Sequence, residues 1–445
     1  MRASGTRSRP LGRTGPEGVR PPAGDAVGQQ PPGPRDGVRG AVAPRFRMRL
    51  GQAGSFRVQR LVLLELAVAA LVVGWVAGPL LMVPAVVVAV LLVSLALVRR
   101  RGRSLPEWLL TARELRARQR RAAALVIPAD AEPALVPALE CEPSLRTYSY
   151  GVRDRRPVGI VGDGTFVTAV LQVEADATAL RAEVSRQPLP LGLVRDALEV
   201  DGIRLESAQI VLHTQPAPAL HLPRQSVAVA NYLPLQQQTG TPAVRITWVA
   251  LKLDPELCAE AVAARGGGAT GARKCVVRVA DHLASRLTGA GFRVTVLDEE
   301  GLVAALATSA CADPLVTAEA ARGSARERRT QESGRNWRCD NRRHTTYWIG
   351  RWPQLGGAES LPRFLTGVTA IPALATTFSL TLARGERQEV SLRGHLRVTG
   401  RSEEELIAAR RALQDTARRS GAGLVRLDRE QVPGMLATLP LGGAR

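Results

Sequence analysis

Lysine is almost absent from this chain, although the chain is strongly basic. Only Lys252 and Lys274 are lysines among 60 basic residues, and 40 acidic residues leave a net charge of +20. Residues 1–121 hold 21 arginines and 6 acids, or +15, which leaves +5 for the remainder. Basic charge gathered near an apolar run suits anionic lipid headgroups and weakens a nucleic-acid-binding interpretation, so no nucleic acid is expected as a partner.

Paired cysteines and catalytic motifs are also missing. The 5 cysteines are an odd number without a CxxC pair, so we expect free thiols rather than a disulfide framework. Neither GxSxG nor HExxH occurs. Cys339 and His344 suggest a metal site or a cysteine nucleophile, but they supply only half of a zinc site. We therefore predict no catalytic residue, no metal and no cofactor.

The longest apolar run covers residues 61–98 and contains one charge, Glu65. Runs of at least about 18 apolar residues are transmembrane candidates. Gly78-Pro79 and Pro84 interrupt the run, which predicts two spans, about 61–77 and 82–98, joined by a tight turn. A buried pair of core helices and one kinked span are the alternatives.

Arginines flank both sides of this run, whereas the turn has no charge. Excess positive charge marks the cytoplasmic side, so we expect a multi-pass protein of the cell membrane with both termini cytoplasmic. The residues predicted to flank the membrane are Arg57, Arg60, Arg99, Arg100, Arg101 and Arg103.

The rest of the chain predicts an α+β domain built from a repeated pattern. Gly289-Ala290-Gly291 and Gly421-Ala422-Gly423 each follow a helical segment and precede a strand. Reading backwards from both gives the order β-α-β-β-α-β twice, so the predicted fold is a transmembrane hairpin followed by two tandem β-α-β-β-α-β units. The predicted divisions are a tail rich in glycine, proline and arginine (1–44), the hairpin with its flanks (45–103), a basic amphipathic helix (104–124), a linker (125–157), the first unit (158–310), a basic connection (311–343) and the second unit (344–440).

Two segments are candidates for binding a partner. In the helix at 104–124, Trp108 and an apolar stripe accompany many arginines, which suits lipid headgroups, a partner helix or an ordinary surface helix. In residues 322–352, nine arginines and three acids give +6, with aromatic residues interleaved. A protein interface, a solvated loop and nucleic acid are the alternatives there. The candidate interface residues are Trp108, Arg335, Trp337, Arg338, Arg342, Arg343, Tyr347, Trp348 and Trp352.

The nearest approach to a phosphate-binding loop runs from Gly266 to Lys274. Ala272 stands where that motif requires lysine, and the preceding segment reads as a helix rather than a strand. A membrane-anchored enzyme domain that binds a nucleotide or nucleotide-sugar is therefore only the alternative function.

Four segments resemble EccE of actinobacterial type VII (ESX) secretion systems, most closely Streptomyces-type members, over roughly residues 56–442. They are the apolar hairpin RLVLLELAVAALVVGWVAGPLLMVPAVVVAVLLV, SLPEWLLTARELRARQRR, DALEVDGIRLESAQIVLHTQPAPA and QESGRNWRCDNRRHTTYWI. The resemblance implies a non-enzymatic membrane component at the periphery of a complex with EccB, EccC and EccD, in which EccC is the ATPase. It supplies no catalytic residues to transfer.

Overall fold

The computed structural model describes residues 56–76, 78–97, 99–100, 103–128, 130–151, 156–175, 188–215, 227, 230, 244–323, 327–353, 360–385 and 389–443. The chain divides into two compact units, Met1–Arg47 and Met48–Arg445. The first unit, and with it the tail predicted at 1–44, lies outside the described residues. All helices and strands among the described residues lie in the second unit.

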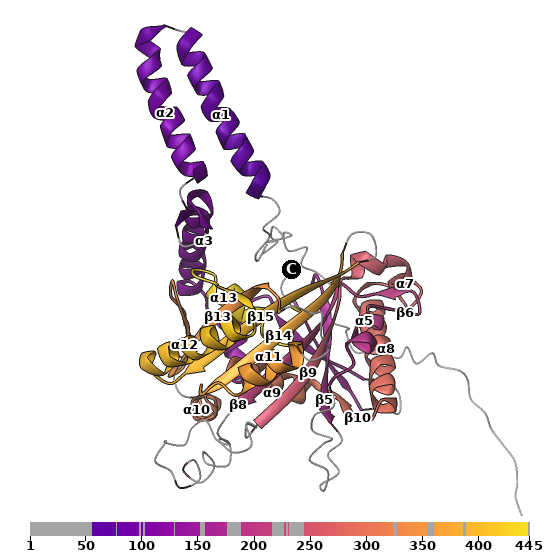
Figure 1. Cartoon of the computed structure of the whole chain (residues 1–445). Helices are drawn as coiled ribbons and strands as arrows, with labels where there is room; N and C mark the ends of the chain where they lie inside the picture. The colour runs from indigo at the N-terminus through magenta and orange to yellow at the C-terminus, as the bar shows by residue number, and fades with distance from the viewer. Residues whose placement is uncertain are drawn as a thin grey trace, which may run out of the picture. The chain divides into compact units, whose positions relative to one another are not determined.

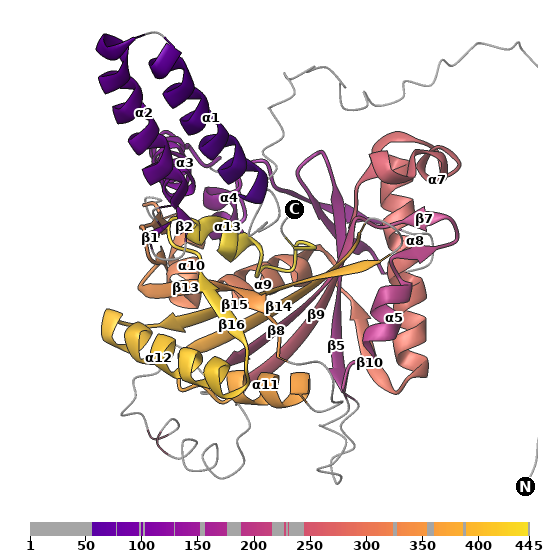
Figure 2. The same cartoon turned by 45° about the horizontal axis from the view of Figure 1, so that its top comes forward.

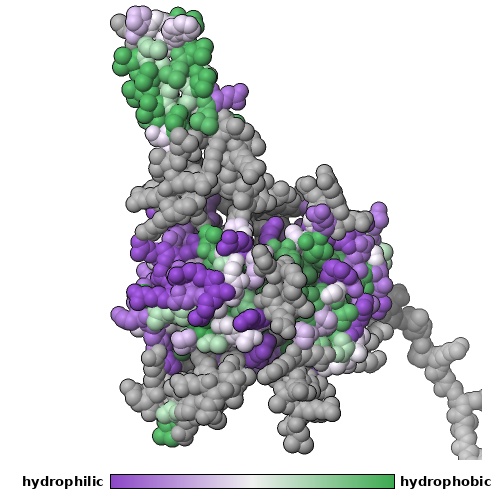
Figure 3. Space-filling model, viewed as in Figure 1, coloured by the Kyte–Doolittle hydropathy of each residue, from purple (hydrophilic) through white to green (hydrophobic). Residues whose placement is uncertain are grey.

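The N-terminal elements are helices α1 (Phe56–Val76) and α2 (Pro79–Leu97), the short strands β1 (Arg99–Arg100) and β2 (Arg103–Ser104), and helix α3 (Leu105–Ala123). Helices α1 and α2 lie side by side, with Ala67 and Ala89 buried (Figure 1). Large apolar side chains are exposed along both helices, and Figure 3 shows them as a continuous apolar surface. The side chains of the six arginines predicted to flank the run lie outside the described set.

The predicted transmembrane hairpin is not supported. Among the residues that the structure describes, no helix combines the length and the apolar character needed to cross a membrane. The prediction of a membrane protein, with its multi-pass placement in the cell membrane, is therefore wrong. The helices also differ from the predicted spans: α1 begins at Phe56 and includes Arg57, Arg60 and Glu65, and α2 contains Pro84.

The α+β part of the chain is dominated by one large antiparallel sheet of 12 strands. Its first half, residues 146–310, contains β3 (Arg146–Tyr150), β4 (Val158–Gly162), β5 (Val167–Ala175), α5 (Leu191–Asp196), β6 (Glu199–Val200), β7 (Ile203–Arg204), β8 (Ser207–Gln215), β9 (Val244–Leu253), a 3-10 turn (Pro255–Cys258), α7 (Ala259–Ala263), α8 (Gly268–Gly289), β10 (Phe292–Val296) and α9 (Glu299–Ala310). Helix α4 (Val136–Cys141) precedes it. Strands β6 and β7 form a separate two-stranded sheet.

The second half, residues 330–436, repeats the arrangement. It contains β11 (Thr330–Glu332), β12 (Trp337–Cys339), β13 (Arg342–Arg351), α11 (Ser360–Thr369), β14 (Ala375–Arg384), β15 (Val390–Gly400), α12 (Glu403–Arg419), β16 (Gly423–Arg426) and α13 (Gln431–Leu436). Helix α10 (Pro314–Ala321) connects the halves.

The order of strands across the sheet is symmetrical. It runs β11-β12-β13-β15-β14-β8-β9-β5-β4-β3, with β10 paired to β5 and β16 paired to β13. Strand β5 thus pairs with β4, β9 and β10, just as β13 pairs with β12, β15 and β16. The halves join where β8 runs antiparallel to β14, from Ser207↔Ala383 to Thr214↔Thr376. Pairing these two strands leaves neither with an open edge, so the halves share one sheet.

Helices cover both faces of this sheet because successive strand residues point to opposite sides. One core contains Ala169 and Leu171 of β5 and is covered by α5, α7 and α8 in the first half and by α11 and α12 in the second. The other contains Val170, between those two residues, and is covered by α4, α9 and α13. Figure 2 shows α11 and α12 along the strands of the second half and α5 and α8 beside those of the first.

Side-chain hydrogen bonds and glycine conformations within short stretches of the sequence set the ends of several helices and strands. The Asp163 carboxylate accepts hydrogen bonds from the backbone N–H groups of Thr165 and Phe166, which closes the turn between β4 and β5. Ser402 caps α12 by accepting a bond from the Glu405 N–H, and three glutamates follow it in the first turn. The predicted glycine positions after α8 and α12 are left-handed, with φ of 88° at Gly291 and 70° at Gly421.

Candidate functional site

A group of polar contacts joins helix α3 to the far edge of the sheet. The guanidinium of Arg118 donates two hydrogen bonds to the carboxylate of Glu332 on β11, at 2.9 and 3.1 Å. The neighbouring Gln119 amide donates to the Glu332 carbonyl at 3.0 Å. The side chain of Glu332 is only 5% exposed and that of Arg118 14%. A paired, two-point contact of this kind fixes both the position and the rotation of α3.

Glu332 also holds the start of helix α13. Its carboxylate accepts a hydrogen bond from the backbone N–H of Val432 at 3.0 Å, and the carbonyl of Arg429 accepts another from Arg118. Arg429 has a left-handed φ of 67°, an uncommon conformation for a residue other than glycine. The carboxylate lies at the positive N-terminal end of α13, where negative charge is favourable. One side chain therefore connects α3, β11 and α13.

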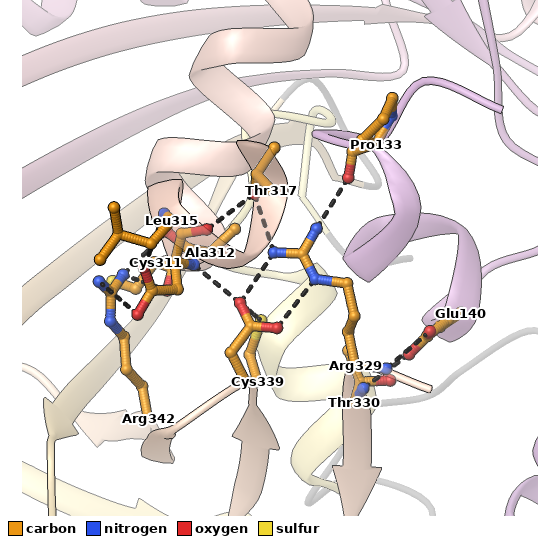
Figure 4. A network of polar contacts seen from close by, with 12 residues as sticks. Pro133, Glu140, Cys311, Ala312, Leu315, Thr317, Arg329, Thr330, Cys339 and Arg342 are labelled. Atoms are coloured by element: carbon orange, nitrogen blue, oxygen red, sulfur yellow. Dashed lines mark hydrogen bonds and ion pairs between the residues drawn. The ribbon is translucent and has the colours of Figure 1, made fainter. Parts of the chain in front are cut away.

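A second buried ion pair lies beside this contact. Arg329 and Asp340 form two hydrogen bonds of 2.8 Å, and their side chains are 6% and 1% exposed. Arg329 also donates to the Pro133 carbonyl at 2.8 Å and to the Thr317 hydroxyl at 2.9 Å (Figure 4). The paired carboxylate raises the pKa of the Arg329 guanidinium, against the effect of burial. Arg329 thus bonds the segment before α4, helix α10 and the loop after β12.

The carboxylate of Glu140, on helix α4, completes this network. It accepts hydrogen bonds from the backbone N–H of Arg329 at 2.9 Å and from that of Thr330 at 2.6 Å. These donors lie at the outer strand β11, whose edge would otherwise be open. The contact closes this end of the sheet with a helix that precedes the first half in sequence, as Figure 4 shows.

Two buried arginines of the second half bind the C-terminal end of α9 in the first half. Arg342 donates to the carbonyls of Cys311 and Ala312, at 2.7 and 2.8 Å, and lies 3.6 Å from the carboxylate of Asp313. Arg397 donates to the carbonyl of Ser309 and is fully buried. Positive charge is favourable at a helix C-terminus, where the last carbonyls have no partner within the helix. These hydrogen bonds therefore connect β13 and β15 of the second half to the end of α9 in the first half.

Burial, with the charge of Arg397, lowers the pKa values of two nearby histidines. Burial first, and Arg397 second, lowers the pKa of His213 to about 3. The same two causes depress the pKa of His344 well below its usual range. Burial also lowers the pKa of Arg397 itself, and none of the ion pairs among the described residues includes it. The helix carbonyl takes the place of a counter-ion here.

Residues 437–443 cover the seam between the halves. The carbonyl of Ala437 accepts hydrogen bonds from Gln209 of the first half at 2.9 Å and from Ser379 of the second at 2.8 Å. The side-chain amide oxygen of Gln209 accepts a hydrogen bond from the Gly442 backbone N–H at 2.8 Å. The Ser207 hydroxyl donates to the Gly442 backbone carbonyl at 2.6 Å. These seven residues are thus part of the core of the sheet.

We call the contacts made by Arg118, Glu140, Arg329, Glu332, Asp340, Arg342, Arg397 and residues 437–443 the junction. Its chemical capacity depends on the thiols beside it and on the side chains that could hold a metal ion. Burial raises the pKa of the thiols of Cys141 and Cys339, which keeps them protonated and unreactive. Within the part of the chain that the structure describes, no group of three or more histidine, cysteine, aspartate or glutamate side chains is placed to hold a metal ion. In the Gly266–Lys274 segment, residues 268–274 already belong to helix α8, and helix α7 precedes the segment in place of the strand that a phosphate-binding loop requires. The arrangement positions helices relative to the sheet.

The structure separates the predicted interface residues into two groups. Trp337, Arg342 and Tyr347 are buried, because β12 and β13 lie inside the sheet and its two faces are covered; Tyr347 lies in one core and Trp337 in the other. Arg335 and Arg338 are exposed, whereas Arg343, Trp348 and Trp352 are partly exposed. Arg338 lies opposite Arg343, whose guanidinium is 3.5 Å from Glu403. The side chain of Trp108 lies outside the described set.

Sequence reasoning missed several residues of the junction, namely Arg118, Glu140, Arg329, Glu332, Asp340 and Arg397. Arg329 and Asp340 lay inside the segment read as a connection, because its charge suggested a loop. The signal available was the short alternating run Trp337 to Cys339 followed by Asp340-Asn341, which is typical of a hairpin. The partners Arg118 and Glu332 are 214 residues apart, so no local pattern connects them.

Comparison with known proteins gives one informative match. Residues 241–349, about a quarter of the chain, match the model of the family described as "Putative type VII ESX secretion system translocon, EccE". The matched residues run from β9 into β13 and include Arg329, Glu332 and Asp340 of the junction. They support an EccE-type component of a secretion system.

The other comparisons add little. No curated protein sequence matches the chain. Among 18 chains of solved structures that match, one is titled "alkyldihydroxyacetonephosphate synthase in P212121", with 9% identity and a TM-score of 0.24. The match covers 61% of this chain and 43% of that one, so the chain spans less than half the length of that structure. A TM-score this low carries no argument about fold or function.

Proposed function

We propose that this protein is a non-enzymatic, structural subunit of a type VII secretion translocon. The observation that carries the proposal is the match of residues 241–349 to the EccE family. The resemblance read from the sequence names EccB, EccC and EccD as the partner subunits. Anionic lipid headgroups and a Streptomyces-type subfamily belong to the same proposal.

The junction described above supports this role. A scaffold has to keep its contact surfaces in fixed positions relative to one another. Arg118 and Glu332 hold α3 to β11 and α13, and Arg329 with Asp340 holds α4 and α10 to the same edge. Helices α1 and α2 precede α3 in the chain, and their apolar surface remains exposed in the chain on its own. Large exposed apolar surfaces mark places that an assembly covers.

Co-purification tests the proposal. The full-length chain, tagged at its N-terminus, should recover EccB, EccC and EccD from cells of an organism that carries the system. Deleting the gene should disrupt secretion, and the wild-type gene should restore it. Recovery of the chain alone, together with undisturbed secretion after deletion, would refute the scaffold role.

A variant of the junction sharpens this test. Glu332→Gln keeps the shape of the side chain but removes the charge that pairs with Arg118. We expect lower recovery of the partners while the α+β domain still unfolds cooperatively. Asp196→Asn, which likewise keeps the shape of the side chain and removes an exposed carboxylate next to Arg195, is the matched control and should leave recovery unchanged.

A further inference from the structure

Helix α3 presents a line of arginines on the side that faces away from the domain. Arg118 and Gln119 face the sheet through their contacts with Glu332. Arg113, Arg116 and Arg120 are exposed, and their spacing of three and then four residues places them on one face of the helix. At about 1.5 Å per residue the line is about 10 Å long. We call Arg113, Arg116 and Arg120 the arginine stripe.

The charges of the stripe are not neutralised within the described part of the chain. No ion pair or side-chain hydrogen bond there involves Arg113, Arg116 or Arg120. Three like charges at helical spacing repel one another and lower the stability of an isolated helix. Binding of a partner whose carboxylates cover these three arginines would relieve their mutual repulsion, so such binding is favourable.

Apolar side chains accompany the stripe at its N-terminal end. Leu109 and Leu110 are 49% and 52% exposed. Exposed leucines beside arginines form a mixed surface, in which the apolar groups supply contact area and the charges supply specificity. Because Arg118 and Gln119 fix the rotation of α3, this surface has a set orientation relative to the domain.

We propose that the arginine stripe, with Leu109 and Leu110, docks an acidic amphipathic helix of a partner subunit in the translocon. The inference rests on the proposed function. Carboxylates spaced three and four residues apart on the partner would match the stripe, since guanidinium groups pair with carboxylates through two parallel hydrogen bonds. An anionic lipid surface is the other occupant that suits basic residues, and the vesicle measurement below distinguishes it from a partner helix.

Binding to defined peptides tests the charge requirement. The probe is a fluorescent 18-residue helical peptide with leucines on one face and three glutamates at spacings of three and four, and its control has glutamine at those positions. Full-length protein should bind the glutamate peptide about tenfold more tightly, as three exposed ion pairs of about 0.5 kcal/mol each would give. Added salt should remove the difference. Equal binding of both peptides would overturn the proposal.

Variants then show whether the stripe is responsible. The triple change R113E/R116E/R120E should abolish the preference for glutamate, whereas R113K/R116K/R120K should keep most of it. R411E/R418E/R419E, on the exposed side of α12, makes the same change of charge elsewhere and should have no effect. If the stripe variant instead loses only binding to phosphatidylglycerol vesicles and keeps its peptide preference, the stripe binds lipid and the proposal fails.

Co-purification separates failure of this inference from failure of the proposed function. If wild-type protein recovers no secretion subunits, the proposed function fails. If wild type recovers them and R113E/R116E/R120E recovers the same amount, the proposed function stands and the arginine stripe is not the docking surface. Loss of at least one subunit from the stripe variant, with unchanged thermal unfolding, is the expected result.

Discussion

The two halves of the sheet have the same strand order, but different kinds of side chain donate hydrogen bonds to the end of the last helix in each half. At the end of α9 in the first half, the carbonyls of residues 309, 311 and 312 accept bonds from Arg342 and Arg397. At the end of α13 in the second half, the carbonyl of Ala437 accepts bonds from the neutral Gln209 and Ser379. In both cases the donors on the sheet include residues of the opposite half.

The two helix ends also differ in the charges around them. Helix α9 has 12 residues and α13 has 6. At α9 the Asp313 carboxylate lies 3.6 Å from Arg342, and Arg397 bonds a helix carbonyl, whereas neutral donors suffice at α13. The shared topology therefore comes from the apolar pattern, while each half has its own polar contacts.

The largest expected effect concerns the buried ion pair between Arg329 and Asp340 at the outer edge of the second half. Arg329→Ala leaves Asp340, 1% exposed, without its partner, so the free energy of unfolding should fall by about 3–5 kcal/mol. Urea-induced unfolding measures the loss. Arg195→Ala, in an exposed pair of the first half, is the control. Equal losses from the two variants would show that burial of the pair does not matter.

A slightly smaller effect tests whether the halves unfold together. Leu283 on α8 and Leu413 on α12 are both buried in the core on the same face of the sheet. Each change to alanine should lower the free energy of unfolding by about 2–5 kcal/mol. Because β8 pairs with β14, circular dichroism and tryptophan fluorescence should report one coincident transition for each variant. Two separated transitions would show that the halves are independent.

Acid should weaken both halves through buried histidines. Burial, with Arg397 as a second cause, lowers the pKa of His213 to about 3; burial, with Arg393, lowers that of His395 to about 4. The unfolded chain takes up these protons near pH 6.5, so stability is complete above that pH and falls towards the folded pKa values. Each histidine should cost roughly 1.4 kcal/mol per pH unit in this window.

Unfolding in urea at a series of pH values between 7 and 5 measures this slope. Replacing His213 and His395 with glutamine should reduce the slope, and each single variant should reduce it by a similar amount. An unchanged slope in the double variant would mean that other groups cause the loss in acid.

The smallest effects should come from exposed ion pairs, one in each half. Arg278 lies 2.8 Å from Asp201 in the first half, and Arg343 lies 3.5 Å from Glu403 in the second. Each change of arginine to alanine should alter the free energy of unfolding by less than about 1 kcal/mol. Thermal unfolding in 0.5 M salt, roughly enough to screen surface charges, should remove even this difference. A larger loss from Arg343→Ala would point to a structural role for the exposed edge.

Local patterns in the sequence predicted much of the α+β fold. The two Gly-Ala-Gly turns marked the repeated order of strands and helices. The pairing of β8 with β14 was not predicted, because both strands are apolar on one face and no residue specifies the neighbour. Trp337 and Tyr347 looked like surface aromatics until their strands were known. Long-range polar pairs such as Arg118 and Glu332 have no local signature.

The contacts made by residues 437–443 form late in synthesis. Gln209, Ser207 and Thr168 find their partners 233, 235 and 273 residues later in the chain. Until those residues leave the ribosome, these three side chains lack the partners that they have in the folded chain. The edge of β8 stays unpaired until β14 has been made, and such edges are prone to aggregate. Contacts of such long range also slow folding. We therefore expect the nascent chain to depend on chaperones while β14 and residues 437–443 are still missing.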